Sequence, residues 1–423
     1  MRKIWLLIQE NSLPEHGMLN RHANFAKYLP EYGYQPVVVV ASKTRCSQRQ
    51  MITSNEPFVV DESHGFPFVY IRVNDYGDSM KKRLVAIVEY HLRLIKHSKE
   101  LAQAFGIPDV VLGSSNYPIT PTLAIKLAKR FHAKSICEIR DLWPLSLEEY
   151  GIIKRGGLIA KAMYVLERYN YRKSDAIIFT MAGGASYIVD KKWDIESGGD
   201  IDLSKVFHIN NGVDLETFER NTKEKTFCHP ALEPNGRAKL VYAGSIRKAN
   251  GLGFIVDLAD EMKSDPVDFI IMGDGGERAE LEKDAERRGL SNIWFIGNVD
   301  KPFIPSALSR GTLMLLMYSA SQSDLSKYGM SQNKLFDYLA SGKPVISNLP
   351  SAYSIVNEQD CGIERSFDNA RECAQVIRRM LSDHEKMDEW SKNSRKAALA
   401  YSFRSLAGKL ASIVDSIVCP PRN

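Results

Sequence analysis

Residues 328–346 read Tyr-Gly-Met-Ser-Gln-Asn-Lys-Leu-Phe-Asp-Tyr-Leu-Ala-Ser-Gly-Lys-Pro-Val-Ile. This order predicts a helix that Ser331 caps and that ends at Gly342, before Pro344 and a buried strand. The first amide groups of the helix and the Lys334 ammonium favour an anion beyond the helix end, such as a diphosphate. A helix that leads into an apolar strand is typical of an α/β protein.

Three polar residues of this helix share one face. Asn333, Asp337 and Ser341 follow one another at intervals of four, and residues four apart are neighbours on a helix surface. A carboxylate one turn inside a phosphate-binding helix end is well placed to accept hydrogen bonds from ribose hydroxyls. The alternative is an amphipathic helix with a solvated Asp337, and the segment alone does not decide between the two.

Length and composition indicate the class of protein to which this stretch belongs. The chain has 423 residues, 44% of them hydrophobic and 25% charged, which indicates a globular protein of two domains. The net charge of +5 fits anionic ligands or a membrane surface. Six cysteines without a CxxC pair or zinc spacing read as reduced thiols. The first residues are too briefly apolar for a signal peptide, and no apolar run would span a bilayer, so we expect a cytoplasmic protein.

Short apolar runs alternate with amphipathic segments along the whole chain, which predicts parallel, doubly wound sheets. The expected strands of the first half are Ile4–Gln9, Gln35–Ala41, Phe68–Val73, Val110–Gly113, Lys134–Ile139, Ala176–Thr180 and Val206–Ile209. Those of the second half are Lys239–Ala243, Asp268–Met272, Ile293–Phe295, Leu313–Met317 and Pro344–Ser347.

The polar stretch 215–237 reads as the linker between two Rossmann-like domains. We place the first domain at 1–215 and the second at 216–402. In such sheets ligands bind outside the carboxyl ends of the strands, so two domains of this kind would face a cleft.

In the second half, three strand-end loops are candidates for binding a nucleotide. Gly244 and Ser245 follow the strand that ends at Ala243, and Arg247 and Lys248 could neutralise a phosphate there. A plain basic turn would explain this loop equally well. Gly273 opens a second glycine turn, which lacks the full dinucleotide fingerprint. At the third strand end, near Asn298, backbone groups could read a base edge.

In the first half, the loop after the first strand contains Gly17, which would permit close approach of a ligand. Glu15, His16, Arg21 or His22 could contact that ligand, although a lone histidine such as His22 is more often a satisfied structural residue.

Arg140 and Asp141 end another strand of the first half, before Trp143-Pro144. They are candidates for the acceptor side, and the alternative is that they form an ion pair that holds the loop. Asp200-Ile201-Asp202 has the spacing of a metal motif, but it lies in a loop rich in glycine and serine. We therefore read it as solvated and expect no metal site.

Together these segments resemble the family-4 glycosyltransferases, retaining enzymes of the GT-B architecture. The resemblance covers nearly the whole chain. It rests on the Gly17 loop, 138–144 (Glu-Ile-Arg-Asp-Leu-Trp-Pro), 209–214 (Ile-Asn-Asn-Gly-Val-Asp), 243–244, 272–275 (Met-Gly-Asp-Gly) and 334–346. Residues 389–418, with a bend at Tyr401-Ser402-Phe403, are similar to the family's C-terminal helices, and residues 403–423 would cross back to the first domain. The motifs at 140–144 and 333–339 most resemble those of transferases that build O-antigen, capsule or exopolysaccharide, including aminodeoxysugar transferases.

The resemblance implies transfer of a sugar, for which an N-acetylated amino sugar is one candidate, from a UDP-linked donor with retention of configuration. The acceptor would be a glycan or a lipid-linked oligosaccharide, with no cofactor, metal or nucleic acid required. It further implies that Asp337 binds the ribose, that Ser331 and Asn333 contact the donor, and that Lys334, Arg247 and Lys248 hold the diphosphate. Asp141, with Arg140, would orient the acceptor or the sugar.

The chain departs from the family pattern at several positions, one of which is the strand end where the Arg140-Asp141 pair replaces the family's usual histidine. Gly329 stands where the family has the first glutamate of Glu-x7-Glu, so backbone at 329–331 would have to contact the sugar. By direct count the family's arginine and lysine fall on Ser245 and Asn250. These departures keep two other interpretations open, a catalytically silent nucleotide-sugar-binding subunit and a nucleotide-sugar epimerase. An epimerase needs further acid/base carboxylates and a histidine that the sequence does not place.

Two basic, amphipathic segments of the first half indicate a peripheral membrane surface. In residues 80–105, Lys81, Lys82, Arg83, Arg93, Lys96 and Lys99 interleave with Leu84, Ile87, Val88, Leu92 and Ile95. Residues 152–173 carry Lys154, Arg155, Lys161, Arg168, Arg172 and Lys173. We expect this face to dock on the inner face of the cell membrane; the alternative is ordinary core packing with solvated charges.

Overall fold

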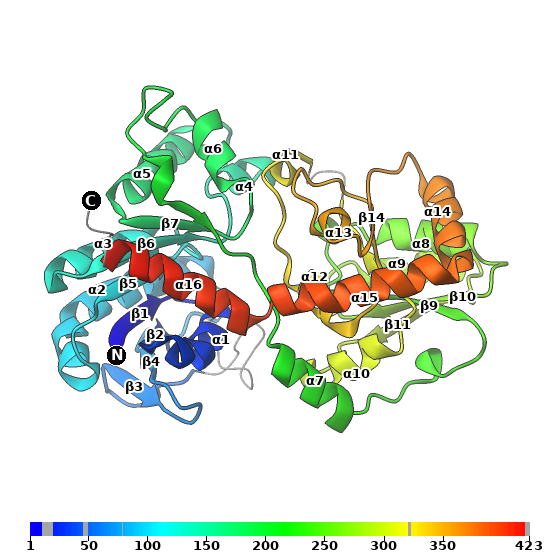
Figure 1. Cartoon of the computed structure of the whole chain (residues 1–423), viewed down its shortest axis with the longest axis horizontal. Coiled ribbons are helices and arrows are strands. Elements are labelled where there is room, and N and C mark those ends of the chain that lie inside the picture. Colours follow the sequence, from blue (N-terminus) through cyan, green and yellow to red (C-terminus); the bar gives the residue numbers. More distant parts are fainter. Residues whose placement is uncertain (11–19, 45–49, 78, 320–322, 419–423) are drawn as a thin grey trace. The chain divides into compact units, whose positions relative to one another are not determined.

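A computed structural model describes residues 1–10, 20–44, 50–77, 79–319 and 323–418. The chain divides into two units, Met1–Asn210 with Phe403–Asn423, and Asn211–Ser402 (Figure 1). The second unit thus begins five residues before the predicted boundary. The predicted linker at 215–237 is wrong, because helix α7 (Leu215–Glu224) begins there and Asp214 caps it by accepting a hydrogen bond from the Thr217 amide at 3.3 Å.

The first unit contains an eight-stranded sheet in the order β3-β4-β2-β1-β5-β6-β7-β8. Its strands are β1 (Arg2–Leu7), β2 (Tyr34–Ala41), β3 (Phe58–Asp61), β4 (Phe68–Ile71), β5 (Val110–Ser114), β6 (Lys134–Ile139), β7 (Ala176–Phe179) and β8 (Val206–His208). Only the β3–β4 pair is antiparallel among the paired strands described. The strand order reverses beside β1, which makes the carboxyl ends of β1 and β5 the expected ligand side of this unit.

Helices cover both faces of the first sheet, which is why its central strands are apolar on both sides. The helices are α1 (Arg21–Tyr28), α2 (Met80–Phe105), α3 (Ile119–Phe131), α4 (Leu145–Glu149), α5 (Leu158–Lys173), α6 (Gly184–Asp190) and α16 (Phe403–Val418), with the 3-10 turns η2 (Leu29–Tyr32) and η3 (Leu203–Lys205). Ile4 and Leu6 pack in one cluster with α1 and α16. Trp5 and Leu7 pack in another with α2 and α3.

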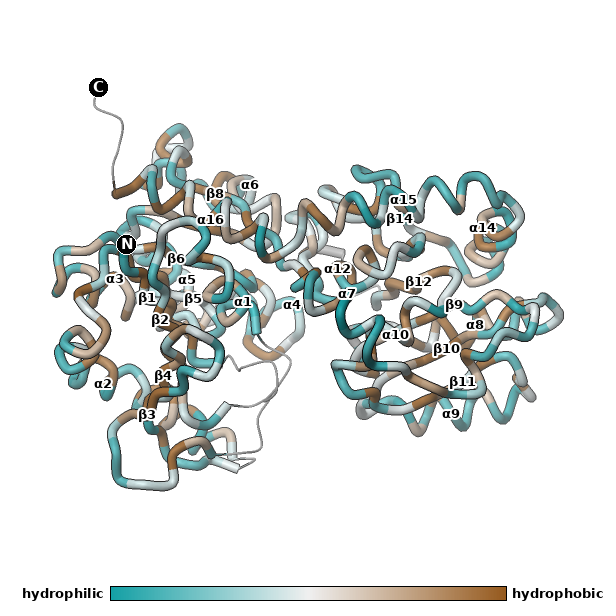
Figure 2. The backbone as a smooth tube through the Cα atoms, turned by 60° about the horizontal axis from the view of Figure 1, so that its bottom comes forward, coloured by the Kyte–Doolittle hydropathy of each residue, from teal (hydrophilic) through white to brown (hydrophobic). Residues whose placement is uncertain are grey.

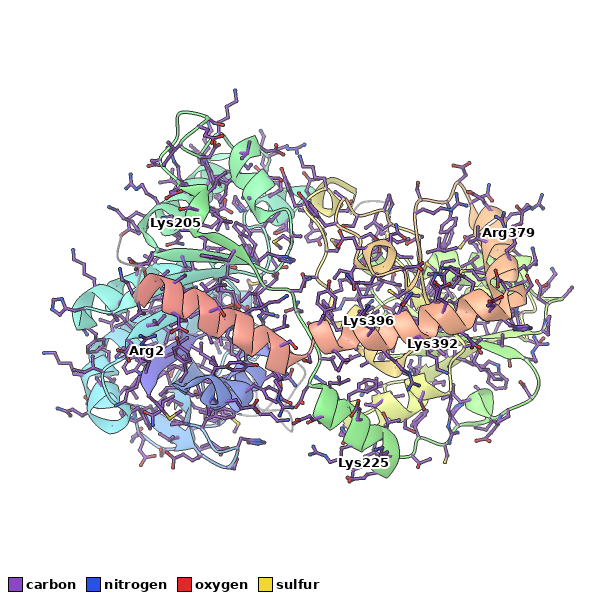
Figure 3. All side chains as sticks on the ribbon, viewed as in Figure 1. Arg2, Lys205, Lys225, Arg379, Lys392 and Lys396 are labelled. Atoms are coloured by element: carbon purple, nitrogen blue, oxygen red, sulfur yellow. The ribbon has the colours of Figure 1, made fainter. Side chains whose placement is uncertain are left out.

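Helix α16 belongs to the first unit although it lies at the end of the chain. Arg2 of β1, labelled in Figure 3, forms an ion pair with Asp415 of α16. Tyr34 donates a hydrogen bond to the same carboxylate at 2.6 Å. Two residues, Tyr401 and Ser402, separate helix α15 (His384–Ala400) from α16, so the helix breaks where the bend at 401–403 was expected.

The second unit contains a six-stranded, wholly parallel sheet in the order β11-β10-β9-β12-β13-β14. Its strands are β9 (Ala238–Ala243), β10 (Val267–Met272), β11 (Ile293–Gly297), β12 (Leu313–Leu316), β13 (Val345–Ser347) and β14 (Gly362–Glu364). Counted within the unit, this is the Rossmann order 3-2-1-4-5-6, whose switch point lies between β9 and β12. The hydropathy tube of Figure 2 is largely brown along these strands.

Alternate residues of β9 face the two helical layers of the second unit. The helices are α7, α8 (Gly253–Glu261), α9 (Arg278–Arg287), α10 (Ile304–Ser309), α11 (Ser323–Ser326), α12 (Asn333–Ser341), α13 (Ile355–Glu358), α14 (Ala370–Ser382) and α15, with the 3-10 turns η4 (Pro230–Leu232), η5 (Lys248–Asn250) and η6 (Lys301–Phe303). Val241 packs in a cluster with α10 and α12, and Leu240 in another with α8 and α14. No helix within the described ranges is both long and apolar enough to cross a membrane.

Candidate functional site

The amino end of α12 carries no side-chain cap. The helix begins at Asn333, and its N-cap residue Gln332 makes no capping hydrogen bond. Over the described residues, the backbone amides of Asn333 and Lys334 donate to no other group. The prediction that Ser331 caps the helix is wrong, because its hydroxyl accepts a hydrogen bond from the Asn211 amide at 2.8 Å. Two amides with the positive end of the helix dipole therefore remain available to an anion.

The Lys334 side chain lies against the Gly244 loop. Its Nζ donates a hydrogen bond to the Tyr242 hydroxyl at 3.0 Å and lies 4.5 Å from the centre of that ring. A Cβ atom at position 244 would lie 3.3 Å from the same Nζ. No carboxylate of the described chain pairs with the ammonium, and burial lowers the pKa of Lys334 to about 7. A diphosphate would supply the missing counter-charge.

Asp337 lies one turn further along α12 and is half-buried. Burial raises its pKa to about 6, while Lys301 acts in the opposite direction. Its carboxylate makes no hydrogen bond to any described residue. Asn333 is exposed, but Ser341 is buried and donates to the Tyr338 carbonyl at 2.6 Å, so the predicted polar stripe is wrong at its third member.

The glycine turns at the ends of β9 and β10 contact each other through their backbones. Gly244 and Gly273 have φ values of 155° and 141°. A Cβ at position 273 would lie 1.9 Å from the Gly244 carbonyl oxygen, so only glycine fits there. The Tyr338 hydroxyl of α12 accepts a hydrogen bond from the Ala243 amide at 2.9 Å. The Gly244 loop is thereby fixed to the same helix that carries Lys334 and Asp337.

Ser245 and Asn250 bond to each other. The Asn250 amide nitrogen lies 2.7 Å from the Ser245 carbonyl oxygen and 3.2 Å from its hydroxyl. Neither side chain adds positive charge to this strand end. Arg247 and Lys248 follow in the loop and are both exposed.

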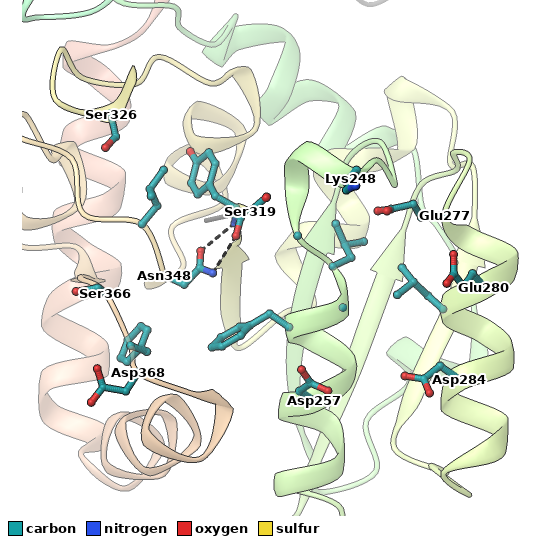
Figure 4. Close-up of a pocket in the computed structure, with 18 of the residues that line it drawn as sticks. Lys248, Asp257, Glu277, Glu280, Asp284, Ser319, Ser326, Asn348, Ser366 and Asp368 are labelled. Carbon is teal, nitrogen blue, oxygen red and sulfur yellow. Dashed lines mark hydrogen bonds between the residues drawn. The ribbon is translucent and has the colours of Figure 1, made fainter. Parts of the chain in front are cut away.

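Lys248 lines a hollow of about 1160 Å³ that includes neither Lys334 nor Asp337 (Figure 4). Its lining includes the carboxylates of Asp257, Glu277, Glu280, Asp284 and Asp368. These carboxylates outnumber the three basic residues of the lining, Lys248, Lys283 and Arg287, and the excess of negative charge disfavours a diphosphate in the hollow. We therefore place the candidate site at the amino end of α12 and not in this hollow.

Asn298 directly follows Gly297, the last residue of β11, and is exposed. It makes no hydrogen bond to a described residue. The Asn298 side chain is thus free to contact a ligand, and base reading by backbone groups of this loop stays a prediction.

In the first unit, Arg140 and Asp141 do not form the ion pair considered from the sequence. The Arg140 guanidinium donates instead to the Asn116 side chain at 3.1 Å, and the Arg140 amide donates to the Ser115 hydroxyl at 3.1 Å. The Asp141 side chain is exposed and makes no hydrogen bond to a described residue, whereas its backbone carbonyl accepts from the Trp143 amide at 2.9 Å. Arg140 is thus built into a strand-end network, while Asp141 is accessible.

That network contains residues that the sequence analysis did not identify. Tyr117, after β5, donates to the Glu10 carboxylate at 2.8 Å and receives a hydrogen bond from Arg83 of α2 at 2.6 Å. Asn116 donates to the Glu10 carbonyl at 3.1 Å. The signal was available, because these polar residues directly follow apolar strands, as Arg140 and Asp141 do.

Arg21 and His22 are not accessible to a ligand, contrary to one of the expectations. The Arg21 Nε donates to Glu138 at 3.0 Å, and the His22 Nε2 lies 2.7 Å from the other Glu138 oxygen. All three side chains are buried. Although burial opposes it, the charges of Arg21 and His22 hold the pKa of Glu138 well below its usual range. Glu15, His16 and Gly17 lie outside the described residues.

No group of three or more His, Cys, Asp or Glu side chains in the described ranges is arranged to hold a metal ion. Asp200 pairs with Arg168 and Arg172 at 3.0 and 3.2 Å. Asp202 caps η3 by accepting from the Ser204 amide at 2.9 Å. Both carboxylates of this Asp-x-Asp thus have structural partners.

Residues 237–383 match the family described as "Glycosyl transferases group 1". This match falls within the second unit. The matched segment contains Gly244, Gly273, Asn298, Lys334 and Asp337, so the open end of α12 lies within it. The two Rossmann-like sheets with their flanking helices are the architecture of GT-B glycosyltransferases.

Two curated relatives match about half of the chain. "Putative colanic acid biosynthesis glycosyl transferase WcaI" of Escherichia coli strain K12 is 24% identical over 57% of this chain and 58% of its own length. "Alpha-D-kanosaminyltransferase" of Streptomyces kanamyceticus is 25% identical over 43% of this chain and 46% of its own length. The chain thus spans about half the length of these relatives.

One solved structure is similar in fold to both units of this chain. Anabaena Alr3699/HepE in complex with UDP superposes with a TM-score of 0.67 and 14% identity, covering 98% of this chain and 100% of that one. At this identity the likeness shows the fold.

Proposed function

We propose that the chain transfers a sugar from a nucleoside diphosphate donor, UDP-linked, to a glycan or lipid-linked acceptor in the biosynthesis of a surface polysaccharide. The observation that carries the proposal is the set of unsatisfied groups on α12. Two free amides and the unpaired Lys334 ammonium lie at its end, and the unpaired Asp337 carboxylate lies one turn further. This combination suits a diphosphate followed by a ribose. The UDP in Alr3699/HepE and the sugar-transferase names of both relatives support the assignment.

The reaction that we propose retains the configuration at the anomeric carbon. The bond from that carbon to the diphosphate breaks, and the bond to the acceptor oxygen forms on the same face. The acceptor proton passes to the departing diphosphate oxygen. Negative charge grows on the diphosphate during this step, and the α12 amides and Lys334 would stabilise it, with help from Arg247. Asp141 is the candidate to orient the acceptor or the sugar.

Donor contacts must differ from those of the wider family, because Gly329 carries no carboxylate. Of the backbone at 329–331, the Gly329 amide already donates to the Ser326 carbonyl at 2.9 Å. The Ser331 carbonyl accepts from the Asn211 side chain at 2.6 Å. We therefore assign the amide and carbonyl of Met330 and the amide of Ser331 as the backbone groups that contact the sugar.

A product analysis tests this function against its two alternatives. The purified chain is incubated with a panel of UDP-sugars, with and without glycolipid acceptors, and both UDP and sugar are followed by NMR. Transfer releases UDP and gives a product of the same anomeric configuration as the donor. An epimerase would change the sugar without an acceptor, and a silent subunit would bind UDP and release nothing. Turnover that required an added divalent metal would contradict the metal-free site.

We also propose that α2 and the start of α5 contact an anionic membrane surface. Five apolar side chains of α2 are at least half exposed, namely Met80, Leu84, Val85, Val88 and Leu92. Leu158 and Ile159 of α5 are 86% and 66% exposed. Exposed apolar groups beside Lys81, Lys82 and Lys161 are the composition of an interfacial helix face.

The structure narrows which residues of these segments can serve this face. Ile87 is buried, and Arg83 bonds to Tyr117, so neither belongs to the exposed surface. Arg168 and Arg172 share an ion pair with the single carboxylate of Asp200, which leaves one net positive charge there. The segments predicted from the sequence thus mix core and surface residues.

Co-sedimentation with vesicles tests the membrane surface. We expect salt-sensitive binding to anionic but not to neutral vesicles, and its loss in Lys81→Ser/Lys82→Ser and in Leu84→Ser/Val88→Ser. The matched control is Lys392→Ser/Lys396→Ser, which removes two exposed lysines from α15 of the other unit (Figure 3). Equal losses in both lysine pairs, or no pelleting at low salt, would refute a specific surface.

A further inference from the structure

Asn211, the first residue of the second unit, is tied to the segment that enters α12. Its backbone amide donates to the Ser331 hydroxyl at 2.8 Å, and its side-chain amide donates to the Ser331 carbonyl at 2.6 Å. Asn211 is 7% exposed. One residue therefore holds both oxygens of a serine that stands two positions before the first residue of the helix.

The engagement of Ser331 bears directly on the open helix end. A serine at the N-cap of a helix accepts a hydrogen bond from one of the first amides of that helix, and Ser331 stands one residue before the N-cap residue Gln332. Here that hydroxyl is occupied by Asn211, and the amides of Asn333 and Lys334 keep no protein partner. A free Ser331 hydroxyl would compete with an anion for these amides.

Other contacts hold the remaining sides of the same region. Tyr338 bonds to Ala243 at the end of β9, and the Phe336 ring packs 5.4 Å from that of Tyr401. Val213, two residues after Asn211, donates to the Tyr401 carbonyl at 3.1 Å. The body of α12 is thus fixed by Phe336 and Tyr338, whereas the segment entering it is held at Ser331 by Asn211.

We propose that Asn211 is a positioning residue for the diphosphate. It keeps Ser331 away from the amino end of α12 and fixes the direction in which the first amides point. This inference rests on the proposed function and goes beyond it, because Asn211 does not itself contact the nucleotide. Its loss should therefore weaken diphosphate binding selectively, and not nucleoside binding or folding alone.

The test compares UDP with uridine by calorimetry in the full chain. Asn211→Ala should weaken UDP binding by about tenfold and uridine binding by no more than about twofold. Asn211→Asp keeps the shape but cannot donate to the Ser331 carbonyl, so it should show the same selective loss. Ser331→Ala removes one of the two hydrogen bonds and should cause a smaller loss with the same selectivity.

The matched control is Asn292, a buried asparagine whose side-chain amide donates to the Ala259 carbonyl at 2.9 Å. It precedes β11 and so lies at the opposite, amino-terminal edge of the same sheet. Asn292→Ala should lower the melting temperature without changing the ratio of UDP to uridine affinity. Equal losses of UDP and uridine in Asn211→Ala, or an unchanged ratio, would overturn the positioning role. Failure of the wild-type chain to bind UDP would instead refute the proposed function itself.

Discussion

The charged side chains at the carboxyl ends of the two sheets differ in whether they are paired with other side chains. In the first unit, Glu138 is buried between Arg21 and His22, and Glu10 and Arg140 bond to neighbouring side chains. In the second unit, neither Lys334 nor Asp337 forms an ion pair with a described residue, and Lys301 acts on Asp337 only at longer range. A buried charge without a partner destabilises the folded state. Such a charge therefore contributes nothing to folding. Unpartnered charges therefore indicate a ligand, whereas partnered charges indicate structure.

The largest expected effect is a loss of stability when a paired charge of the first unit, Glu138, is removed. Glu138→Ala leaves a buried guanidinium unpaired, so we expect the free energy of unfolding to fall by about 3–5 kcal/mol. Chemical denaturation measures the loss. Asp337→Ala is the control, because removal of an unpartnered carboxylate should change stability by no more than about 0.5 kcal/mol. Similar losses in the two variants would remove the distinction between the units.

The next effect concerns Lys334 as the cation nearest the departing diphosphate. Lys334→Gln should reduce kcat by about 10²–10³-fold and weaken UDP binding less, because the charge matters most as the leaving group departs. Steady-state kinetics and calorimetry on the same preparations separate the two effects. Lys283→Gln, an exposed lysine in the lining of the acidic hollow, controls for the change in net charge. Equal losses of turnover and affinity would mean that Lys334 serves binding only.

A smaller effect is expected where Asp337 would meet the ribose. Asp337→Ala should weaken UDP binding by about 1–3 kcal/mol through the loss of charge-assisted hydrogen bonds. The same substitution should have little effect on the binding of 2′,3′-dideoxyuridine diphosphate, which lacks both hydroxyls. An unchanged affinity for UDP, or an equal loss with both nucleotides, would contradict ribose recognition.

Much of this fold follows from local sequence pattern. Every predicted strand is present, because runs such as Val37–Val40 and Phe269–Met272 are buried on both sides and so are apolar throughout. The two strands that were not predicted, β3 and β14, have four and three residues and lie at sheet edges. Too few residues remain there for a periodic signal.

The candidate site was predictable in its residue types but not in its hydrogen bonds. Lys334, Asp337 and the glycine loops could be identified because each lies at a strand or helix end with a recognisable turn. The engagement of Ser331 by Asn211 could not be identified, since the two residues are 120 positions apart. For the same reason the sequence could not show that Arg21 and His22 are occupied by Glu138, which lies more than 110 positions away.

The smallest effect is a proton taken up when the nucleotide binds. The pKa of Lys334 is lowered to about 7 by burial, so at pH 8 most of the free protein carries a neutral amine. A bound diphosphate favours the ammonium and raises this pKa, so binding at pH 8 should take up to one proton, and affinity should fall as pH rises above 7. Asp337, whose pKa is raised to about 6, is already ionised at pH 8 and contributes little. Calorimetry in HEPES and in Tris measures the uptake through the different ionisation enthalpies of the two buffers, and neither buffer adds a phosphate that would compete for the site. Lys334→Gln should abolish the uptake, whereas Asp337→Ala should retain it, and persistence of the uptake in Lys334→Gln would assign the proton to another group.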